Sequence, residues 1–439
     1  MSSATSGYRP LLRTPGAAAF FLAAAVGRVG IAMTGLSLLW LLHSRTGSYG
    51  TAGLATASFA LSEALIGPHL ARLIDRFGQT RVLPFCLLAH GVAIVGVLAS
   101  TTPAASIGCA ACAGAVIPQL GACSAARWAH LLRGRRADEL PAAFSLESLV
   151  NATAFLLGPT LATVLGAAGH ATLGSATAAT LVVGGGGALA AQRRTAPRPE
   201  RTYADAGRPE HVPRERSLLR PDFLILALLN LAIGIYFGTM GISVSAFATQ
   251  HHTPSAAAPI LAAASISGLL SGWLYGLRQH RTPAHLQLVG ATAYLAATAL
   301  LLPFAPSPIW LGAAVILTEA AIPPTLVLLN VLTERSVHPA VLTQAFTWNN
   351  STSAAGSALA ALLAGRFADQ AGASAAFALA PVAGFALLIL SVAARYRGPD
   401  RRRDRRRPNT PQTRRVHSFG RTLADQRIAD SCTAEDTQR

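Results

Sequence analysis

The sequence contains no lysine and few charged residues of any kind. Only 13% of its 439 residues are charged, whereas an average soluble chain carries roughly 25%. Hydrophobic residues make up 51% of the chain, and the mean hydropathy is +0.42. A chain with so few charges cannot keep its whole surface in water. The composition therefore excludes an ordinary soluble protein and favours an integral membrane protein.

Cysteine is also scarce, with five residues in the chain. Cys109 and Cys112 have the spacing of a redox or metal site, but no second pair or histidine cluster accompanies them. We interpret them as small buried side chains in a helix. The sequence has no nucleotide-binding loop and no nucleophile–base pair at a meaningful spacing. We therefore expect no cofactor, no metal and no enzymatic activity.

Long apolar runs, in contrast, are abundant. A transmembrane helix needs about 20 mostly apolar residues to cross the hydrocarbon core. The runs are continuous and rich in Ala and Leu, without the alternation typical of strands, so they predict helices. Twelve spans are expected, at 16–42, 50–71, 82–100, 104–126, 143–167, 171–191, 222–248, 256–277, 284–303, 308–332, 341–364 and 371–394.

Arginines are unequally distributed between the two sides of this predicted membrane protein. One set of short loops holds Arg45 and Arg366. The opposite set holds Arg72, Arg76, Arg81, Arg127, Arg133, Arg135, Arg136, Arg278, Arg281 and Arg335. Because cytoplasmic loops are enriched in basic residues, this asymmetry predicts a multi-pass protein of the cytoplasmic membrane with both termini in the cytoplasm.

The net charge of +17 raises the question of nucleic-acid binding. The run 401–407, six arginines around Asp404, could bind nucleic acid or anionic lipid headgroups. Its position directly after the last predicted span favours lipid contact and a role in topology. We expect the lipid bilayer as a partner and no nucleic acid, and we expect the tail beyond the run to be disordered.

The two halves of the chain repeat one another in order. Gly27 and Gly234, Gly67 and Gly272, Ile117-Pro118 and Ile322-Pro323, and Ala143-Phe144-Ser145 and Ala345-Phe346-Thr347 form pairs at offsets of 202 to 207 residues. An ordered repeat of this kind indicates a duplicated six-span unit. The predicted organisation is a six-helix half at 1–191, a cytoplasmic linker at 192–221, a six-helix half at 222–394 and an Arg-rich cytoplasmic tail at 395–439.

The segment between the second and third predicted spans carries the most specific motif. Gly67, Asp75, Arg76, Gly78 and Arg81 recur here at the spacing of a loop signature, which resembles that of the major facilitator superfamily. Gly78 suits a tight turn that needs an unusual backbone angle. The chain as a whole resembles actinobacterial permeases described as drug-efflux-like. The resemblance implies an all-α integral membrane fold of twelve helices in two six-helix repeats, in which Asp75 latches the halves on the cytoplasmic side.

Several residues depart from the family pattern. Ala71 stands where the signature has glycine, Gln79 stands where a basic residue is common, and the second half has His280 at the position of the acid. Gly158 and Pro159 resemble an antiporter motif that packs helices, but its flanking glycines are missing. The fourth span also lacks the arginine that proton antiporters of the family carry in its outer half. These losses weaken the case for proton antiport.

Polar residues inside the spans are the candidates for substrate or ion coupling, because a charge at membrane depth is expensive and functional by default. Arg28 is expected to face a cavity or to pair with a carboxylate. Glu319 is the best candidate for a carboxylate that takes up and releases a proton; its alternative is a neutral acid bonded to a helix carbonyl. Glu63 could partner Arg81 or Arg72. Asn349 and Asn350 could contact substrate or simply link helices.

The resemblance and these candidates together favour a secondary transporter. We expect it to export a small amphiphilic molecule by alternating access, and proton coupling stays open. An uptake permease or uniporter, and a non-transporting receptor or assembly protein with the same fold, are the alternatives. A sealed interior without polar groups would favour the last of these.

The predicted topology can be tested with a reporter fused after residue 200, inside the predicted linker. Six preceding spans and a cytoplasmic N-terminus place this fusion point in the cytoplasm. A cytoplasmic reporter such as green fluorescent protein should be fluorescent there, and alkaline phosphatase at the same site should be inactive. An active phosphatase would contradict the twelve-span count.

Overall fold

The computed structural model describes residues 8–134, 136–199, 217–278, 280 and 282–397, and these residues belong to one compact unit. Every regular element in these ranges is helical. The arginine run 401–407, most of the predicted tail and the middle of the predicted linker lie outside the described residues.

Within each half, the helices follow one another with short connections. In chain order they are α1 (Tyr8–Leu12), α2 (Ala17–Thr46), α3 (Tyr49–Phe77), α4 (Gln79–Ala99), α5 (Pro103–Ala115), α6 (Leu120–Leu131), η1 (Ala137–Glu139), α7 (Leu140–Ala167), α8 (Ala171–Ala191), α10 (Pro221–Gln250), η3 (Pro254–Ala256), α11 (Ala257–Leu277), α12 (Ala284–Ala299), η4 (Leu302–Phe304), α13 (Pro308–Glu319), α14 (Ile322–Ser336), η5 (Pro339–Val341), α15 (Leu342–Ala371), α16 (Ala373–Phe377) and α17 (Leu379–Arg397).

Ten helical segments in the described part are long and apolar enough to cross a membrane. The two remaining predicted spans correspond to α3 and α15, which have 29 and 30 residues but are not among those ten. Both carry polar residues along their length, such as Glu63 in α3 and Asn350 in α15. These two helices also pack against each other, so one face of each is turned away from lipid. The all-helical, multi-pass architecture is therefore confirmed.

Two of the spans are broken at the same point of the repeat. The break between α5 and α6 contains Pro118, and Pro323 is the second residue of α14, just after the break between α13 and α14. Proline lacks the N–H that a continuous helix needs and clashes with the preceding turn. The spans predicted at 104–126 and 308–332 are therefore each built from two half-helices.

The first half-helix of each broken span also begins in the same way. Thr102 and Ser307 cap α5 and α13 by accepting a hydrogen bond from the backbone N–H three residues on, at 3.3 Å in both cases. Each cap is followed by a proline at the first helical position. A hydroxyl cap followed by proline is a favourable helix start. The caps stand at the same offset as the Ile-Pro repeat, so the whole broken span is duplicated.

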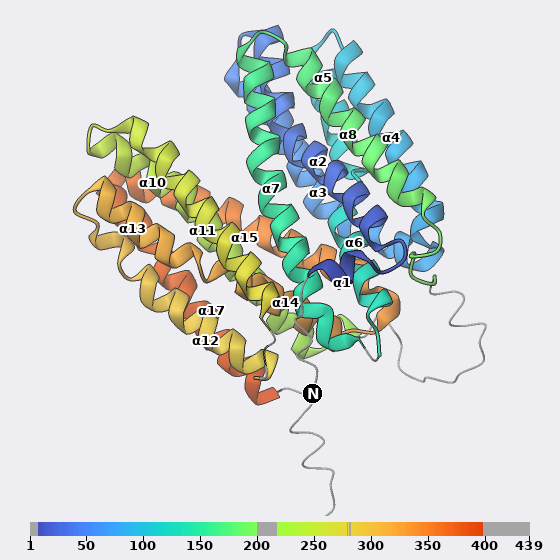
Figure 1. Cartoon of the computed structure of the whole chain (residues 1–439). Coiled ribbons are helices and arrows are strands. Elements are labelled where there is room, and N and C mark those ends of the chain that lie inside the picture. The colour runs from blue at the N-terminus through green and yellow to red at the C-terminus, as the bar shows by residue number, and fades with distance from the viewer. Residues whose placement is uncertain (1–7, 135, 200–216, 279, 281, 398–439) are drawn as a thin grey trace, which may run out of the picture. The chain divides into compact units, whose positions relative to one another are not determined.

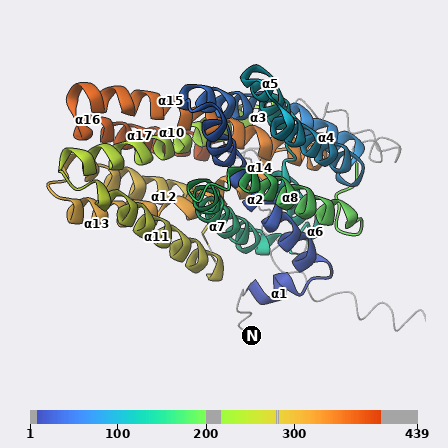
Figure 2. The ribbon, with the colours of Figure 1, turned by 90° about the horizontal axis from the view of Figure 1, so that it is seen from above.

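Helices α2 to α8 gather into one group and α10 to α17 into another, as the two views show (Figures 1 and 2). The groups meet most extensively through α3 with α15 and α7 with α11, and α7 also contacts α14 while α15 contacts α6. In the repeat, α3 corresponds to α11 and α7 to α15, so the two contacts are equivalent. Phe144 and its repeat partner Phe346 touch each other, with ring centroids 5.8 Å apart. Equivalent residues meet in this way only near a two-fold axis of pseudosymmetry.

Glycines allow α10 and α15 to approach closely. A Cβ on Gly234 would overlap the carbonyl of Ser353, and a Cβ on Gly238 would overlap that of Ser357. Gly241, one turn further along α10, faces open space. Small residues at such crossings are typical of membrane helices, where packing replaces the hydrophobic effect.

The close approach predicts that Gly234→Ala destabilises the protein. Overpacking of a tight contact costs about 1–3 kcal/mol, so we expect a lower thermal midpoint for the purified protein in detergent. The matched control is Gly241→Ala, which adds the same methyl group to the same helix without a clash and should leave the midpoint unchanged. Equal midpoints for the two variants would contradict the close packing.

Candidate functional site

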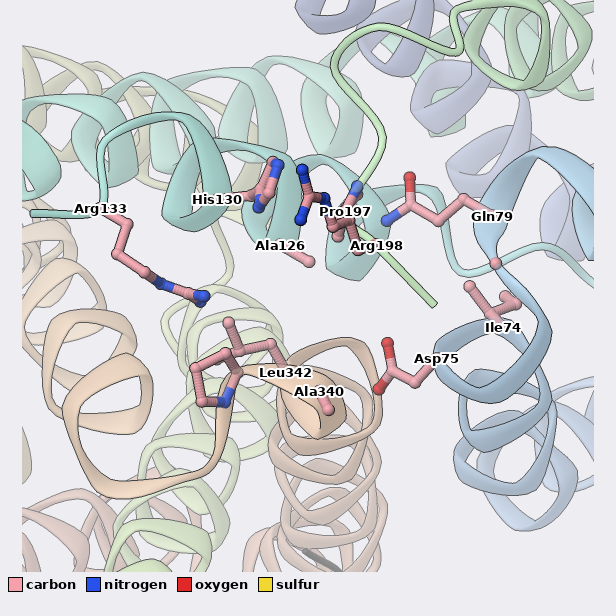
Figure 3. Close-up of a pocket in the computed structure, with 12 residues that line it drawn as sticks. Ile74, Asp75, Gln79, Ala126, His130, Arg133, Pro197, Arg198, Ala340 and Leu342 are labelled. Atoms are coloured by element: carbon pink, nitrogen blue, oxygen red, sulfur yellow. The ribbon is translucent and has the colours of Figure 1, made fainter. Parts of the chain in front are cut away.

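Asp75, in the last turn of α3, is the motif residue that joins the two halves. The side of the bundle where Tyr8, Asp75 and Gln344 lie is called the α1 side. The Oδ2 atom of Asp75 accepts a hydrogen bond from the backbone N–H of Gln344 at 2.8 Å. Gln344 is in the first turn of α15, where N–H groups lack helical partners and the helix dipole is positive. Asp75 therefore caps a helix of the opposite half, and its carboxylate points toward the start of α15 (Figure 3).

The turn itself is made by Gly78, which ends α3 and begins α4. Its φ of +96° lies in the region that favours glycine, and a Cβ there would stand 3.0 Å from Pro199. Arg76 lies over the ring of Phe77, with 5.5 Å between the guanidinium carbon and the ring centroid, and Arg81 is exposed at the start of α4. Glycine at position 78 is thus needed for both its backbone angle and its space.

Arg127 is a correction to the topology argument, which placed it in a loop. It lies inside α6, fully buried. Its guanidinium donates to the carbonyls of Leu189 at 2.9 Å and Gln192 at 3.0 Å, and to the hydroxyl of Thr195 at 2.8 Å. These groups lie at the C-terminal end of α8, the negative end of its dipole. Arg127 therefore stabilises the N-terminal half from within.

The same arginine explains the departure at position 79. The side chain of Gln79 accepts a hydrogen bond from Nε of Arg127 at 2.7 Å and donates one to the carbonyl of Cys123 at 3.1 Å. A basic residue at this position could not accept from Arg127 and would place a second positive charge beside it. Glutamine is the residue that fits.

A buried ion pair lies deeper in the N-terminal half. Arg28 of α2 pairs with Glu147 of α7, with 2.7 Å between Nη1 and Oε2, and the two side chains are only 12% and 4% exposed. Ser124 of α6 donates a hydrogen bond to the other oxygen of Glu147. Arg28 thus has the carboxylate partner that we expected. Glu147 itself was missed, although a glutamate within the predicted span 143–167 was the signal that could have found it.

Glu319 lies at the break between α13 and α14. It is the last residue of α13, and its Oε1 atom accepts a hydrogen bond from the hydroxyl of Tyr236 at 3.0 Å. Tyr236 is fully buried in the middle of α10. Glu319 makes no ion pair with another described residue.

Glu63 lies at the middle of α3 and is partly accessible. It forms no ion pair or hydrogen bond within the described residues, so the structure does not pair it with Arg81 or Arg72. One turn further toward the α1 side, a Cβ on Gly67 would contact Gln119 and Thr347. Residues four apart share a helix face, so Glu63 lies on the face of α3 that is turned toward the opposite half.

The two asparagines of α15 differ. Asn349 is buried and donates to the hydroxyl of Thr333 in α14 at 2.8 Å, a link between helices. Asn350 is exposed and makes no hydrogen bond to another described residue. Of these two residues, Asn350 is the one that remains accessible to a substrate.

Gly158, beside Pro159 in α7, packs against α2, where a Cβ would overlap the backbone of Ala32 and Met33.

His90 of α4 binds a backbone carbonyl near the break in the fourth span. Its Nδ1 lies 3.0 Å from the carbonyl of Ala113, near the end of α5. Among the described residues, no group of three His, Cys, Asp or Glu side chains could hold a metal ion.

A pocket lies on the α1 side where α3, α6 and the start of α15 meet (Figure 3). Asp75 and Gln79 line it from the α3–α4 region, and His130 and Arg133 line it from α6 and the turn after it. Leu342 closes it from the other half. The pocket is therefore part of the junction between the halves.

With this geometry established, the comparisons with known proteins identify the chain. The family model of the Major Facilitator Superfamily matches residues 20–354. The chain therefore belongs to the Major Facilitator Superfamily. No curated protein matches the sequence at a significant level.

Solved structures share the fold over most of the chain. The human organic anion transporter MFSD10 (TETRAN) has a TM-score of 0.66 at 18% identity, covering 85% of this chain and 98% of that one. A bacterial homologue of the iron transporter ferroportin, in an outward-facing state, has a TM-score of 0.68 at 13% identity, with 87% and 99% covered. The transporter FucP in the outward conformation has a TM-score of 0.66 at 15% identity, again with 87% and 99% covered. As a member of this family, the protein is a secondary transporter with the twelve-helix fold of two six-helix repeats, and not an enzyme.

The buried pair Arg28–Glu147 predicts a strong effect of removing one partner. Arg28→Met leaves Glu147 charged and buried, which costs about 3–5 kcal/mol, so the yield of monodisperse protein and its thermal midpoint should fall sharply. The double variant Arg28→Met/Glu147→Gln removes both charges and should recover part of the loss. Arg81→Met, at an exposed site, is the control. A double variant no better than the single one would contradict the pairing.

Proposed function

We propose that the protein exports a small amphiphilic cation by alternating access, in exchange for protons, across the cytoplasmic membrane. The α1 side is then the cytoplasmic side, and both termini are cytoplasmic. The observation that carries the proposal is a charge imbalance at the middle of the membrane. The direction of transport is supported by the resemblance of the Gly67–Arg81 loop to that of drug-efflux-like permeases.

The charge imbalance follows from the mid-span ionisable residues. Glu63 and Glu319 stand near the middle of their spans and have no basic partner among the described residues. The mid-span cation Arg28 is already neutralised by Glu147. An unpaired charge in a low-dielectric interior is costly, so a carboxylate there takes up a proton or binds a cation. This favours a positively charged cargo over the organic anions named for the human structure.

Proton exchange is supported by the position of Glu319. The carboxylate lies at the C-terminal end of the half-helix α13, where the helix dipole makes the potential negative. This position disfavours the ionised acid. Paired broken helices at equivalent positions are also where transporters of this plan place their substrate and ion sites. Glu319 is therefore our candidate for the coupling residue, with Tyr236 as its positioning partner.

An outward-facing state is supported by where the halves touch. The hydrogen bonds between the halves in the described part join residues on the α1 side, such as Asp75 to Gln344 and Ser145 to Gly272. Two of the similar solved structures were captured facing outward. In the export cycle this is the state that releases cargo and takes up protons.

The function can be tested in proteoliposomes with inverted orientation, using a lipophilic phosphonium cation as the cargo probe. An acidic lumen should drive accumulation of the probe, and a sulfonated dye of similar size should not accumulate. Glu319→Gln should lose the gradient-driven accumulation while the protein stays folded, because a neutral amide cannot exchange the proton. Asp369→Asn, which changes an exposed carboxylate of α15, is the control.

The outcomes separate the parts of the proposal. Cation transport that ignores the pH gradient would remove proton coupling and keep the substrate class. Accumulation only with the opposite orientation would indicate an uptake permease. Transport of the dye and not of the cation would contradict the argument from charge.

A further inference from the structure

The latch on the α1 side is unequal in the two halves of the repeat. Asp75 of the N-terminal half caps α15 of the C-terminal half. The equivalent position in the C-terminal half is His280, which cannot cap the start of α7 as an acid would. Burial lowers the pKa of His280, so its ring is mostly neutral at neutral pH, and neither of its forms is an anion.

The start of α7 also has no need of an acid from the other half. Asp138 and Glu139 already stand in the turn that precedes it, and Glu139 pairs with Arg136 at 2.7 Å. The start of α15 has no acidic residue of its own. The two equivalent junctions therefore require different chemistry.

The second junction is instead closed by two hydroxyl groups. Tyr8 of α1 donates to the carbonyl of Trp273 at 2.7 Å, and its oxygen lies 3.4 Å from both the carbonyl of Gly272 and the hydroxyl of Ser145. Ser145 of α7 donates to the carbonyl of Gly272. Burial raises the pKa of Tyr8 above its ordinary value of 10, so the hydroxyl keeps the proton that it donates. Both donors thus bind the last turns of α11, at the negative end of that helix.

The glycines of the repeat fit this difference. A Cβ on Gly276 would overlap the Tyr8 hydroxyl and the side chain of Ser145. The equivalent residue of the first half is Ala71, a departure from the loop signature, and it is completely buried. The space that a methyl group fills in the first half is thus occupied by the Tyr8 hydroxyl in the second. Thr347, the equivalent of Ser145, bonds only to Thr343 of its own helix at 2.9 Å.

We infer that Tyr8 and Ser145 form a second latch, which holds α7 to α11 on the α1 side and replaces the acid lost from the repeated loop. The N-terminal segment before the first span is then a positioning element of the transport cycle. It stabilises the state in which the α1 side is closed. Opening this side requires Tyr8 to leave the end of α11.

The latch can be tested on the full-length protein by double electron–electron resonance. Spin labels at His170→Cys and Thr253→Cys, in a background with the five native cysteines replaced by alanine, report the separation of the two halves on the side opposite α1. Both labelled positions are exposed. Tyr8→Phe removes one hydrogen bond, typically worth enough to change an equilibrium roughly two- to tenfold. The long-distance population should fall relative to the short one by that factor, and Ser145→Ala should act in the same direction.

Two further variants make the result decisive. Tyr294 is an exposed tyrosine of α12 whose hydroxyl has no hydrogen bond within the described residues. Tyr294→Phe should therefore leave the distances unchanged. Asp75→Asn gives the reference shift for the first latch. If Tyr8→Phe lowers the thermal midpoint but leaves the distance populations of the wild type, Tyr8 only anchors α1 and the inference is wrong. This result would leave the proposed substrate class and proton exchange untouched.

Discussion

The constraint on which the whole structure depends is that water cannot satisfy a polar group at membrane depth, so the protein must do so itself. The chain meets this constraint repeatedly at helix ends. Arg127 binds the last carbonyls of α8, and Arg45 binds those of α4, at 3.0 and 2.8 Å. His90 takes the carbonyl released by the break after α5. Each side chain supplies positive charge or a hydrogen-bond donor at the negative end of a helix. Because the side chain belongs to a different helix, the bond also holds the two helices together.

The same rule, applied between the halves, makes the junction breakable. Within a half, close contacts at buried glycines and the hydrogen bonds of Arg127 hold the helices together. These contacts stay in place when one half moves as a rigid body against the other. Between the halves, the described hydrogen bonds are few and use groups at helix ends, such as the Asp75 carboxylate. A net hydrogen bond contributes only about 0.5–1.5 kcal/mol, so a small set of them stabilises one state without preventing the other. Alternating access needs an energy difference of this size.

The fold was largely predictable from the sequence, and the site only in part. Continuous apolar runs and the arginines on one side show whether each segment faces lipid or water. This is a local property of the segment, so the spans could be predicted from it. The breaks were not predicted: continuous spans were expected at 104–126 and 308–332, although the Ile-Pro pairs of the repeat mark both breaks because proline acts on its own backbone. Partners could not be found in this way. Glu147 pairs with Arg28 from a helix that lies more than a hundred residues further along the chain. Arg127 was assigned to a loop because it is charged, and only its contacts with the end of α8 explain why it is buried in a helix. The role of Tyr8 could not be predicted, because its hydroxyl occupies the space left by the missing side chain of Gly276, far away in the sequence.

The duplication and its departures together show that the two halves share a backbone plan and differ in chemistry. Both halves share the cap, the proline break and the close contact at Phe144 and Phe346, because these features set the backbone. The chemistry differs at equivalent points: Glu319 ends α13, where the N-terminal half has Gly114, packed against the backbone of α3. The ionisable group of the break is thus confined to one half, while the buried ion pair is confined to the other. A symmetric molecule would bind the same charge on both sides of its axis. In this molecule the carboxylate at the break, Glu319, belongs to the C-terminal half, whereas the buried pair of Arg28 and Glu147 belongs to the N-terminal half.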